Sequence, residues 1–266
     1  MKNTTLATYL LLSVVVSLFI SAPLSAENGK QALISIVIDD IGYRLHEDLR
    51  AIGLPGQVAF AIMPHSPHAG QMSALANELG KDVLLHLPMQ ATSDDKNRFL
   101  GPGALTLQMT HSEFIQVLDS SLRSVPHASG VNNHMGSLLT RHPGHMAWLM
   151  ESLKSRNKYY LDSVTSNRSV AINVAREMAL PHLRRDVFLD NIQNDEKIET
   201  QFDELISIAK RKGYAIAIGH PYPETMSVLS RKLLLLDKIG VKLISPRDML
   251  ARKKGTASLH KISLQK

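Results

Sequence analysis

The segment Leu33–Gly42 constrains the fold more than any other part of the sequence. Residues 33–38 form a nearly continuous apolar run rich in β-branched residues, which is typical of a strand buried on both faces of a parallel sheet. The run ends in Asp39 and Asp40, whose charges favour the carboxyl end of the strand. Since neighbouring strand residues point to opposite faces, both acids can serve one site only if the backbone leaves its regular pleat. Gly42 permits such a turn.

Similar polar residues follow other predicted strands. They are His86 after residues 82–85, His134 after 130–133, Asp162 after 159–161, and His220 after 215–219. Taken alone, each histidine is more often a structural or surface residue than a ligand, and paired acids often cap helices. Their recurrence at strand ends favours one shared site, since the carboxyl ends of parallel strands meet at one edge of a sheet.

Strand-like and helix-like segments alternate about eight times without a linker. The further predicted strands cover residues 57–63, 186–190 and 241–244. The pattern Thr110-His111-Ser112-Glu113 predicts a capping box at the start of one helix, and Gly213 ends another. This alternation predicts one α/β domain over residues 27–251, most simply a barrel.

The first 26 residues have the layout of a secretory signal peptide. Lys2 precedes the apolar run Leu10–Ile20 and the small-residue sequence Ala22–Ala26, so we expect cleavage after Ala26 and a periplasmic or secreted protein. An uncleaved anchor is the competing interpretation. Cleavage after Ala26 leaves 240 residues (266 minus 26), in which no segment predicts a membrane span. Residues 252–266 are predicted to form a basic polar tail.

Composition narrows the class of protein further. Cysteine is absent, so the core alone has to hold an exported domain of this size. Lys and Arg number 30 against 24 Asp and Glu, a modest excess that suits an anionic envelope surface or polymer. No basic stripe carries interleaved aromatic residues, which argues against a nucleic-acid partner.

One carboxylate and two imidazoles on rigid strands are a common ligand set for a catalytic divalent metal, and Zn²⁺ suits these donors best. Asp40, His86 and His134 are the predicted ligands. Asp39 is the predicted base, and His220 the predicted acid for a leaving amine. His65 and His68, in a loop after the second strand, remain alternative ligands.

Several other polar positions are expected to contact substrate. The long loop Ala91–Thr106 begins beside His86, and loops of this length are usually functional, so it is predicted to form a wall of the substrate cleft. Polar residues at or beside further strand ends complete the predicted substrate contacts: Asn133, Asp162, Arg185 and Asp190.

From about Leu33 to Leu250 the chain resembles the polysaccharide deacetylase (NodB-like) superfamily, specifically its divergent polysaccharide deacetylase branch of exported bacterial proteins. The resemblance is carried by residues 36–42, 85–89, 132–137, 186–190 and 218–221. It implies a distorted (β/α) barrel of about seven parallel strands. It also implies that Asp39 acts as base, that Asp40 binds metal, and that His220 acts as general acid.

Two motifs depart from that superfamily's pattern. Gln90 stands where a second metal-binding histidine is expected, so His134 is predicted to replace it, and Asn132–Ser137 occupies the place of an Arg-x-Pro-Tyr motif. Two functions therefore stay open. One is a metal-dependent hydrolase that removes acetyl groups from an envelope or secreted polysaccharide, such as a peptidoglycan-type glycan. The other is a non-catalytic periplasmic carbohydrate-binding or envelope partner protein on the same barrel.

Overall fold

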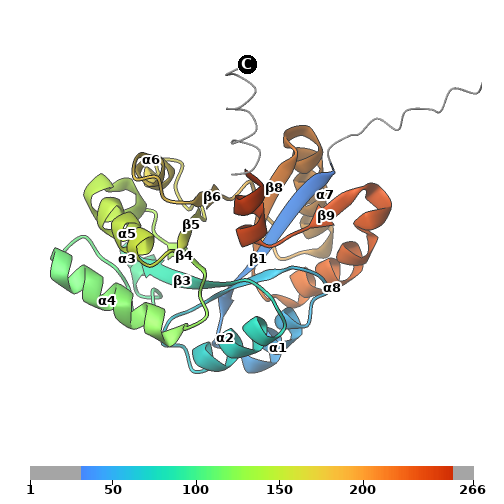
Figure 1. The fold of residues 1–266 in the computed structure, drawn as a ribbon. Coiled ribbons are helices and arrows are strands. Elements are labelled where there is room, and N and C mark those ends of the chain that lie inside the picture. Colours follow the sequence, from blue (N-terminus) through green and yellow to red (C-terminus); the bar gives the residue numbers. More distant parts are fainter. Residues whose placement is uncertain (1–30, 254–266) are drawn as a thin grey trace, which may run out of the picture. The chain divides into compact units, whose positions relative to one another are not determined.

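A computed structural model of the chain describes residues 31–253. Its centre is a curled parallel sheet of nine strands, with helices on the outside of the curl (Figure 1). The predicted leader and nearly all of the predicted tail lie outside the described residues. Among residues 31–253, no helix is long and apolar enough to span a membrane.

The strands follow one another around the sheet in the order β6-β5-β4-β3-β2-β1-β8-β7, and β9 pairs with the start of β1. Every pairing is parallel. Strands β6 and β7 do not pair with each other, so the barrel stays open between them. The strands are β1 (Ala32–Ile41), β2 (Ala59–Ile62), β3 (Val83–Met89), β4 (Gly130–Met135), β5 (Tyr159–Asp162), β6 (His182–Arg184), β7 (Val187–Phe188), β8 (Tyr214–Gly219) and β9 (Val241–Leu243).

This arrangement confirms the predicted distorted (β/α) barrel. The number of strands is higher than the seven expected, because three of the nine are only two or three residues long. The short strand β6 was not predicted at all. Strand β3 also runs four residues past its predicted end, which places His86 within the strand instead of after it.

Eight α-helices and three short 3₁₀ segments connect the strands. The α-helices are α1 (Leu45–Ile52), α2 (Ala69–Glu78), α3 (Asp94–Asn97), α4 (His111–Ser124), α5 (Pro143–Ser155), α6 (Ala171–Glu177), α7 (Asp195–Lys212) and α8 (Pro223–Lys232). The predicted capping box of Thr110 and Glu113 at α4 is confirmed, and Gly213 ends α7 in the left-handed conformation.

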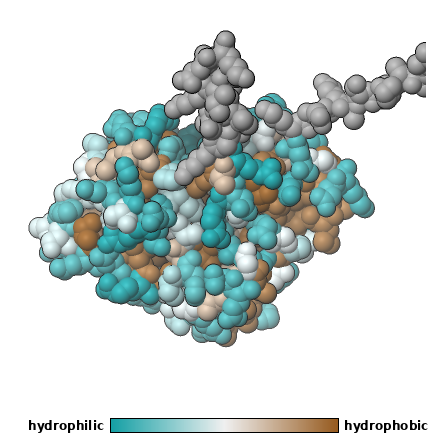
Figure 2. Space-filling model, viewed as in Figure 1, coloured by the Kyte–Doolittle hydropathy of each residue, from teal (hydrophilic) through white to brown (hydrophobic). Residues whose placement is uncertain are grey.

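Alternation along the strands separates two hydrophobic clusters. In β1, Ile34, Ile36 and Ile38 pack toward the helices, whereas Leu33 and Val37 point into the barrel. Hydrophilic residues cover much of the face seen in Figure 2. The inner cluster is small because polar residues replace apolar ones toward the carboxyl ends of the strands, and there it gives way to the candidate site.

At the opposite, amino-terminal end, the barrel is closed by a buried polar network. The carboxylate of Asp82, which precedes β3, accepts hydrogen bonds from the Tyr159 hydroxyl at 3.1 Å, from the backbone N–H of Arg247 at 3.0 Å, and from Ser129 Oγ. Residues 246–253 are helical and carry Met249 into the inner cluster. This end of the barrel is therefore packed shut, and access to the interior comes from the carboxyl ends.

Candidate active site

The two acids of β1 share one site because the backbone leaves its pleat between them. Asp40 has φ = 60°, and the register against β2 passes from Ile38 opposite Phe60 to Ile41 opposite Ile62, so β1 carries one extra residue. Such a bulge redirects a side chain, and it brings Asp40 to the same side as Asp39. The expected departure is confirmed. It occurs at Asp40 itself, while Gly42 (φ = 123°) continues the turn against Ser66.

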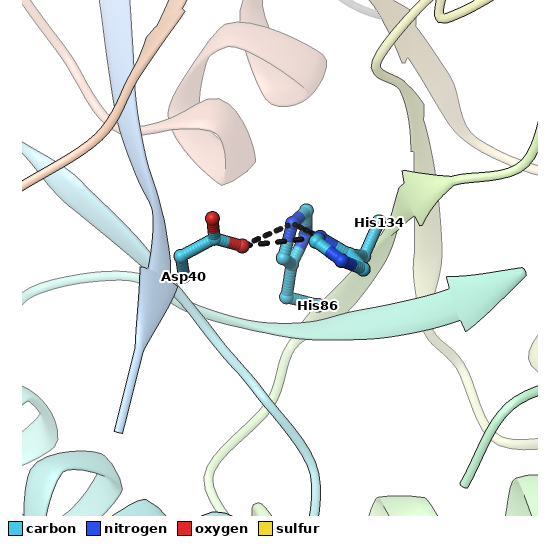
Figure 3. A group of neighbouring side chains, drawn as sticks. All are labelled: Asp40, His86 and His134. Carbon is cyan, nitrogen blue, oxygen red and sulfur yellow. Dashed lines mark hydrogen bonds and ion pairs between the residues drawn. The ribbon is translucent and has the colours of Figure 1, made fainter. Parts of the chain in front are cut away.

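Three predicted ligands meet at one point (Figure 3). Asp40 comes from β1, His86 from β3 and His134 from β4. Asp40 Oδ1 lies 3.2 Å from His86 Nε2 and 3.1 Å from His134 Nδ1, and the two nitrogens lie 3.2 Å apart. Among the described residues, this is the group of acids and histidines arranged to hold a metal ion. His65 and His68 are not part of it.

The donor atoms fit a metal ion chemically. Asp40 Oδ1 is buried and has no hydrogen-bond partner of acceptable geometry, although both nitrogens face it. Asn132 donates its amide N–H groups to Asp39 Oδ1 and Ser163 Oγ, so its amide oxygen faces His86 Nδ1 at 2.9 Å and accepts a hydrogen bond from the Nδ1–H. In the neutral imidazole ring, His86 Nε2 therefore carries a free lone pair, which points toward Asp40 and His134.

The distances also fit. Ligand atoms about 2.1 Å from a tetrahedral metal lie about 3.4 Å from one another, close to the observed edges of 3.1–3.2 Å. Burial opposes the charge on Asp40, but His134 and His86 outweigh it and hold its pKa well below the ordinary value. Burial lowers the pKa of His86, whereas the carboxylates of Asp39 and Asp40 outweigh it and raise this pKa. The site therefore favours a cation.

Asp39 lies beside this triangle and is itself buried. Its Oδ2 is 3.6 Å from His86 Nε2, while Oδ1 accepts the Asn132 hydrogen bond at 2.8 Å. Burial raises the pKa of Asp39 above its ordinary value, against the opposing influence of His86 and His220. Asn132 was not assigned a role from the sequence. Asn132 is paired directly with His86 in the β3–β4 register, and this pairing is the signal that could have identified it.

His220 approaches from the end of β8. Its Nε2 is 3.8 Å from Asp40 Oδ2, and its Nδ1 is hydrogen-bonded to Asp190 Oδ1 at 2.9 Å. Asp190 Oδ2 also accepts hydrogen bonds from the His220 backbone N–H and from Thr225 Oγ1. Burial alone would lower the pKa of His220, but the hydrogen bond to Asp190 and the nearby carboxylates raise it to about 9.

The four residues predicted to contact substrate make hydrogen bonds to other parts of the protein. Asp190 orients His220. Both oxygens of Asp162 accept hydrogen bonds within its own loop, from Val164 N and Ser169 Oγ. Asn133 binds the backbone of Met135 and Ser163, and Arg185 donates to the carbonyls of Ser163 and Val164. Strand alternation explains Asn133 and Asp162, since each follows an inward-facing residue and points away from the site. Their contact with substrate stays a prediction.

The site opens into a cleft of about 420 Å³, here called the active-site cleft. Asp40, His134 and His220 form its floor. Its walls include Phe99 from the predicted cleft loop, and also side chains that the sequence did not single out: Tyr43, Arg44, Met63, Met135, Pro221 and Tyr222. Gln90 faces elsewhere, because its side-chain oxygen accepts a hydrogen bond from Leu107 N.

The fold is a distorted (β/α) barrel of the NodB-like type, and Asp40, His86 and His134 form a candidate metal site at the carboxyl ends of its strands. The chain belongs to the divergent polysaccharide deacetylase family, which it matches over residues 36–250. An uncharacterised protein of Escherichia coli (strain K12), YibQ, is 40% identical over 214 residues, which span 80% of this chain and 65%, just under two thirds, of the relative.

Solved structures share the fold. An uncharacterised protein from Agrobacterium tumefaciens C58 is 21% identical, with a TM-score of 0.78 over 82% of this chain and 89% of its own. A CE4 family pseudoenzyme from Bacillus anthracis is 10% identical, with a TM-score of 0.50 over 84% of this chain and 66% of its own. At these identities the similarity concerns the fold alone.

Proposed function

We propose that this protein is a metal-dependent hydrolase that removes acetyl groups from a polysaccharide of the cell envelope or a secreted glycan. The observation that carries the proposal is that Asp40, His86 and His134 lie together. Asp39 lies beside His86, and His220 lies near Asp40. The family description points to the same reaction. The signal-peptide pattern of residues 1–26 favours action outside the cytoplasm.

Asp40, His86 and His134 would hold the ion, and Zn²⁺ suits these nitrogen and oxygen donors best. When bound, a divalent ion polarises the acetyl carbonyl and lowers the pKa of water. The protein supplies the acid and base. Asp39 Oδ2 is the atom free to take a proton from the attacking water, because Oδ1 is held by Asn132. The raised pKa of Asp39 brings its basicity closer to neutral pH.

His220 supplies a proton to the leaving nitrogen. Asp190 accepts the Nδ1–H, so Nε2 is the atom that faces Asp40 and the active-site cleft. Because the pKa of His220 is raised to about 9, the ring is protonated at neutral pH, as a general acid must be. Breakdown of the tetrahedral adduct expels an amine poorly unless its nitrogen is protonated.

The alternative function is a carbohydrate-binding protein without turnover. Gln90, at the position of an expected ligand, is turned away from the site, and the same fold occurs in a pseudoenzyme. Against this, a protein that only binds has no need of a buried base beside one ligand and an oriented acid beside another.

Acetate release from acetylated peptidoglycan and chitin-type oligomers tests the proposal. His220→Ala should keep its metal and still bind these glycans, while turnover falls by about a hundredfold to ten-thousandfold. His65→Ala, an exposed histidine in a neighbouring loop, should leave turnover unchanged. A wild-type protein that binds glycan but releases no acetate would support the binding protein instead.

A further inference from the structure

A second hollow lies next to the active-site cleft. This hollow, here called the side groove, has a volume of about 760 Å³ and lies where the sheet is open between β6 and β7. Its walls come from α3, from the segments that follow β5 and β7, and from one face of α7. Lys96, Thr165, Phe188, Lys197 and Gln201 are among its lining residues.

Two contacts and one short segment show that the two hollows adjoin. The ring of Phe188 lies 5.3 Å from the ring of His220, which lines the active-site cleft. Thr165 donates a hydrogen bond of 2.6 Å to the carbonyl oxygen of Met135, another lining residue of that cleft. Lys96 and Phe99 are three residues apart and line one hollow each. The two hollows therefore lie side by side, and together they are here called the trough, which includes Asp40, His134 and His220.

The acids of the side groove are neutralised by neighbours. Asp186 pairs with Lys212 at 2.6 Å, and Glu204 pairs with Arg211 at 3.4 Å. Neither of these two cations lines the groove.

The cations of the trough are mostly unpaired. Within residues 31–253, the Nζ atoms of Lys96 and Lys197 make no hydrogen bond or ion pair, and the Arg44 guanidinium makes none either. All three residues are exposed. Each hollow of the trough therefore offers unpaired cations to a ligand, namely Arg44 in the active-site cleft and Lys96 and Lys197 in the side groove.

We infer that the substrate is a linear, negatively charged glycan that binds across this trough, with an internal sugar over Asp40 and flanking sugars in the side groove. Two hollows in a row suit a polymer better than a monosaccharide. Neutral side chains such as Gln201 and Asn191 can bind sugar hydroxyls, and the unpaired cations select for carboxylate groups. This inference rests on the proposed function, since it concerns the substrate of the same site.

Binding measurements on the full chain test the inference without requiring turnover. The probes are a peptidoglycan-derived hexasaccharide with free lactyl carboxylates, a chitin hexasaccharide of equal length, and the corresponding disaccharides. Lys197→Glu is the test variant. Lys210→Glu is its matched control, because Lys210 is also exposed on α7 but does not line the side groove.

We expect the wild type to bind the anionic hexasaccharide more tightly than either the neutral hexasaccharide or the anionic disaccharide. Lys197→Glu should weaken the binding of the anionic hexasaccharide by about three- to tenfold and leave the disaccharides unaffected. This loss should shrink at high salt, and Lys210→Glu should bind as the wild type does.

Equal affinity for the neutral and anionic hexasaccharides, or an equal loss in both lysine variants, would overturn the inference even if acetate is released. Conversely, charge-selective, Lys197-dependent binding without acetate release would support the inference about the ligand while contradicting the proposed hydrolysis.

Discussion

At the scale of single residues, the site depends on side chains that hold the reactive ones. Asn132 connects Asp39 to His86, and Asp190 connects His220 to Thr225. Each of these hydrogen bonds determines which atom of its partner is free. Asn132 leaves Oδ2 of Asp39 and Nε2 of His86 available, and Asp190 leaves Nε2 of His220 available.

Asp190→Asn should shift the pH dependence of acetate release. His220 acts as an acid only while protonated, so the rate falls as pH rises through its folded-state pKa, which is about 9. The neutral amide removes the charge that supports the imidazolium, so this basic limb should move to lower pH in the variant. A bound cation would move the basic limb of the pH–rate profile to lower pH in both proteins. The informative quantity is therefore the difference in this pH between the variant and the wild type.

The measurement is the rate of acetate release from pH 5 to pH 10 for both proteins. The variant should lose much of its rate at pH 8 and much less at pH 6. A uniform loss at every pH would indicate that Asp190 only supports the local structure.

The residues that lie together in the site were predictable from the sequence, whereas the direction in which each side chain points was predicted less well. All five proposed catalytic and metal-binding side chains lie together. Alternation within a strand, applied to Asn133 and Asp162, could have shown that these two residues point outward. The left-handed conformation of Asp40 could not be read from its residue type, because only the pairing of β1 with β2 defines the bulge.

At the scale of elements, the turn after β1 positions both Asp40 and the start of α1. The backbone N–H of Gly42 donates to Asp48 Oδ2 at 2.9 Å, and the carbonyl of Gly42 accepts from His68 N. A Cβ atom at Gly42 would lie 2.0 Å from Ser66 Oγ. Only glycine suits both this contact and φ = 123°.

Gly42→Ala should therefore lower the free energy of unfolding by about 1–3 kcal/mol and weaken metal binding. Gly70→Ala is the matched control, because a Cβ at Gly70, in α2, meets nothing within 4 Å and should be neutral or slightly stabilising. Chemical denaturation measures both. Equal stability of the two variants would show that the turn tolerates a side chain.

Long strands and helices were predictable from their periodicity, whereas short elements were not. Strand β6 has three residues, only one of them fully buried, and therefore no recognisable apolar run. It forms because β5 offers an open edge to which it can pair. Strand β3 continues through Pro88 for a similar reason, since β4 pairs with it up to Met135.

At the scale of the whole barrel, stability and chemistry are concentrated at opposite ends. The network of Asp82 closes the amino-terminal end, and its donors include the hydroxyl of the buried Tyr159. Removing the carboxylate would leave the buried Tyr159 hydroxyl and the part-buried Arg247 N–H without this acceptor, which is costly.

Asp82→Ala should accordingly reduce the free energy of unfolding by about 2–4 kcal/mol, while the metal content of the folded protein stays unchanged. Asp203→Ala removes an exposed carboxylate and should change stability by much less. Denaturation curves and metal analysis on the same samples separate the two properties. Loss of metal in folded Asp82→Ala protein would show that the two ends of the barrel are coupled.

The central claim is that Asp40, His86 and His134 bind one divalent metal ion. The most direct test is the metal content of purified wild-type, His134→Ala and His65→Ala proteins by mass spectrometry after equilibration with Zn²⁺. We predict about one ion per chain in the wild type and in His65→Ala, and a loss of most of it in His134→Ala, with all three proteins folded. An undiminished metal content in His134→Ala would contradict the assignment.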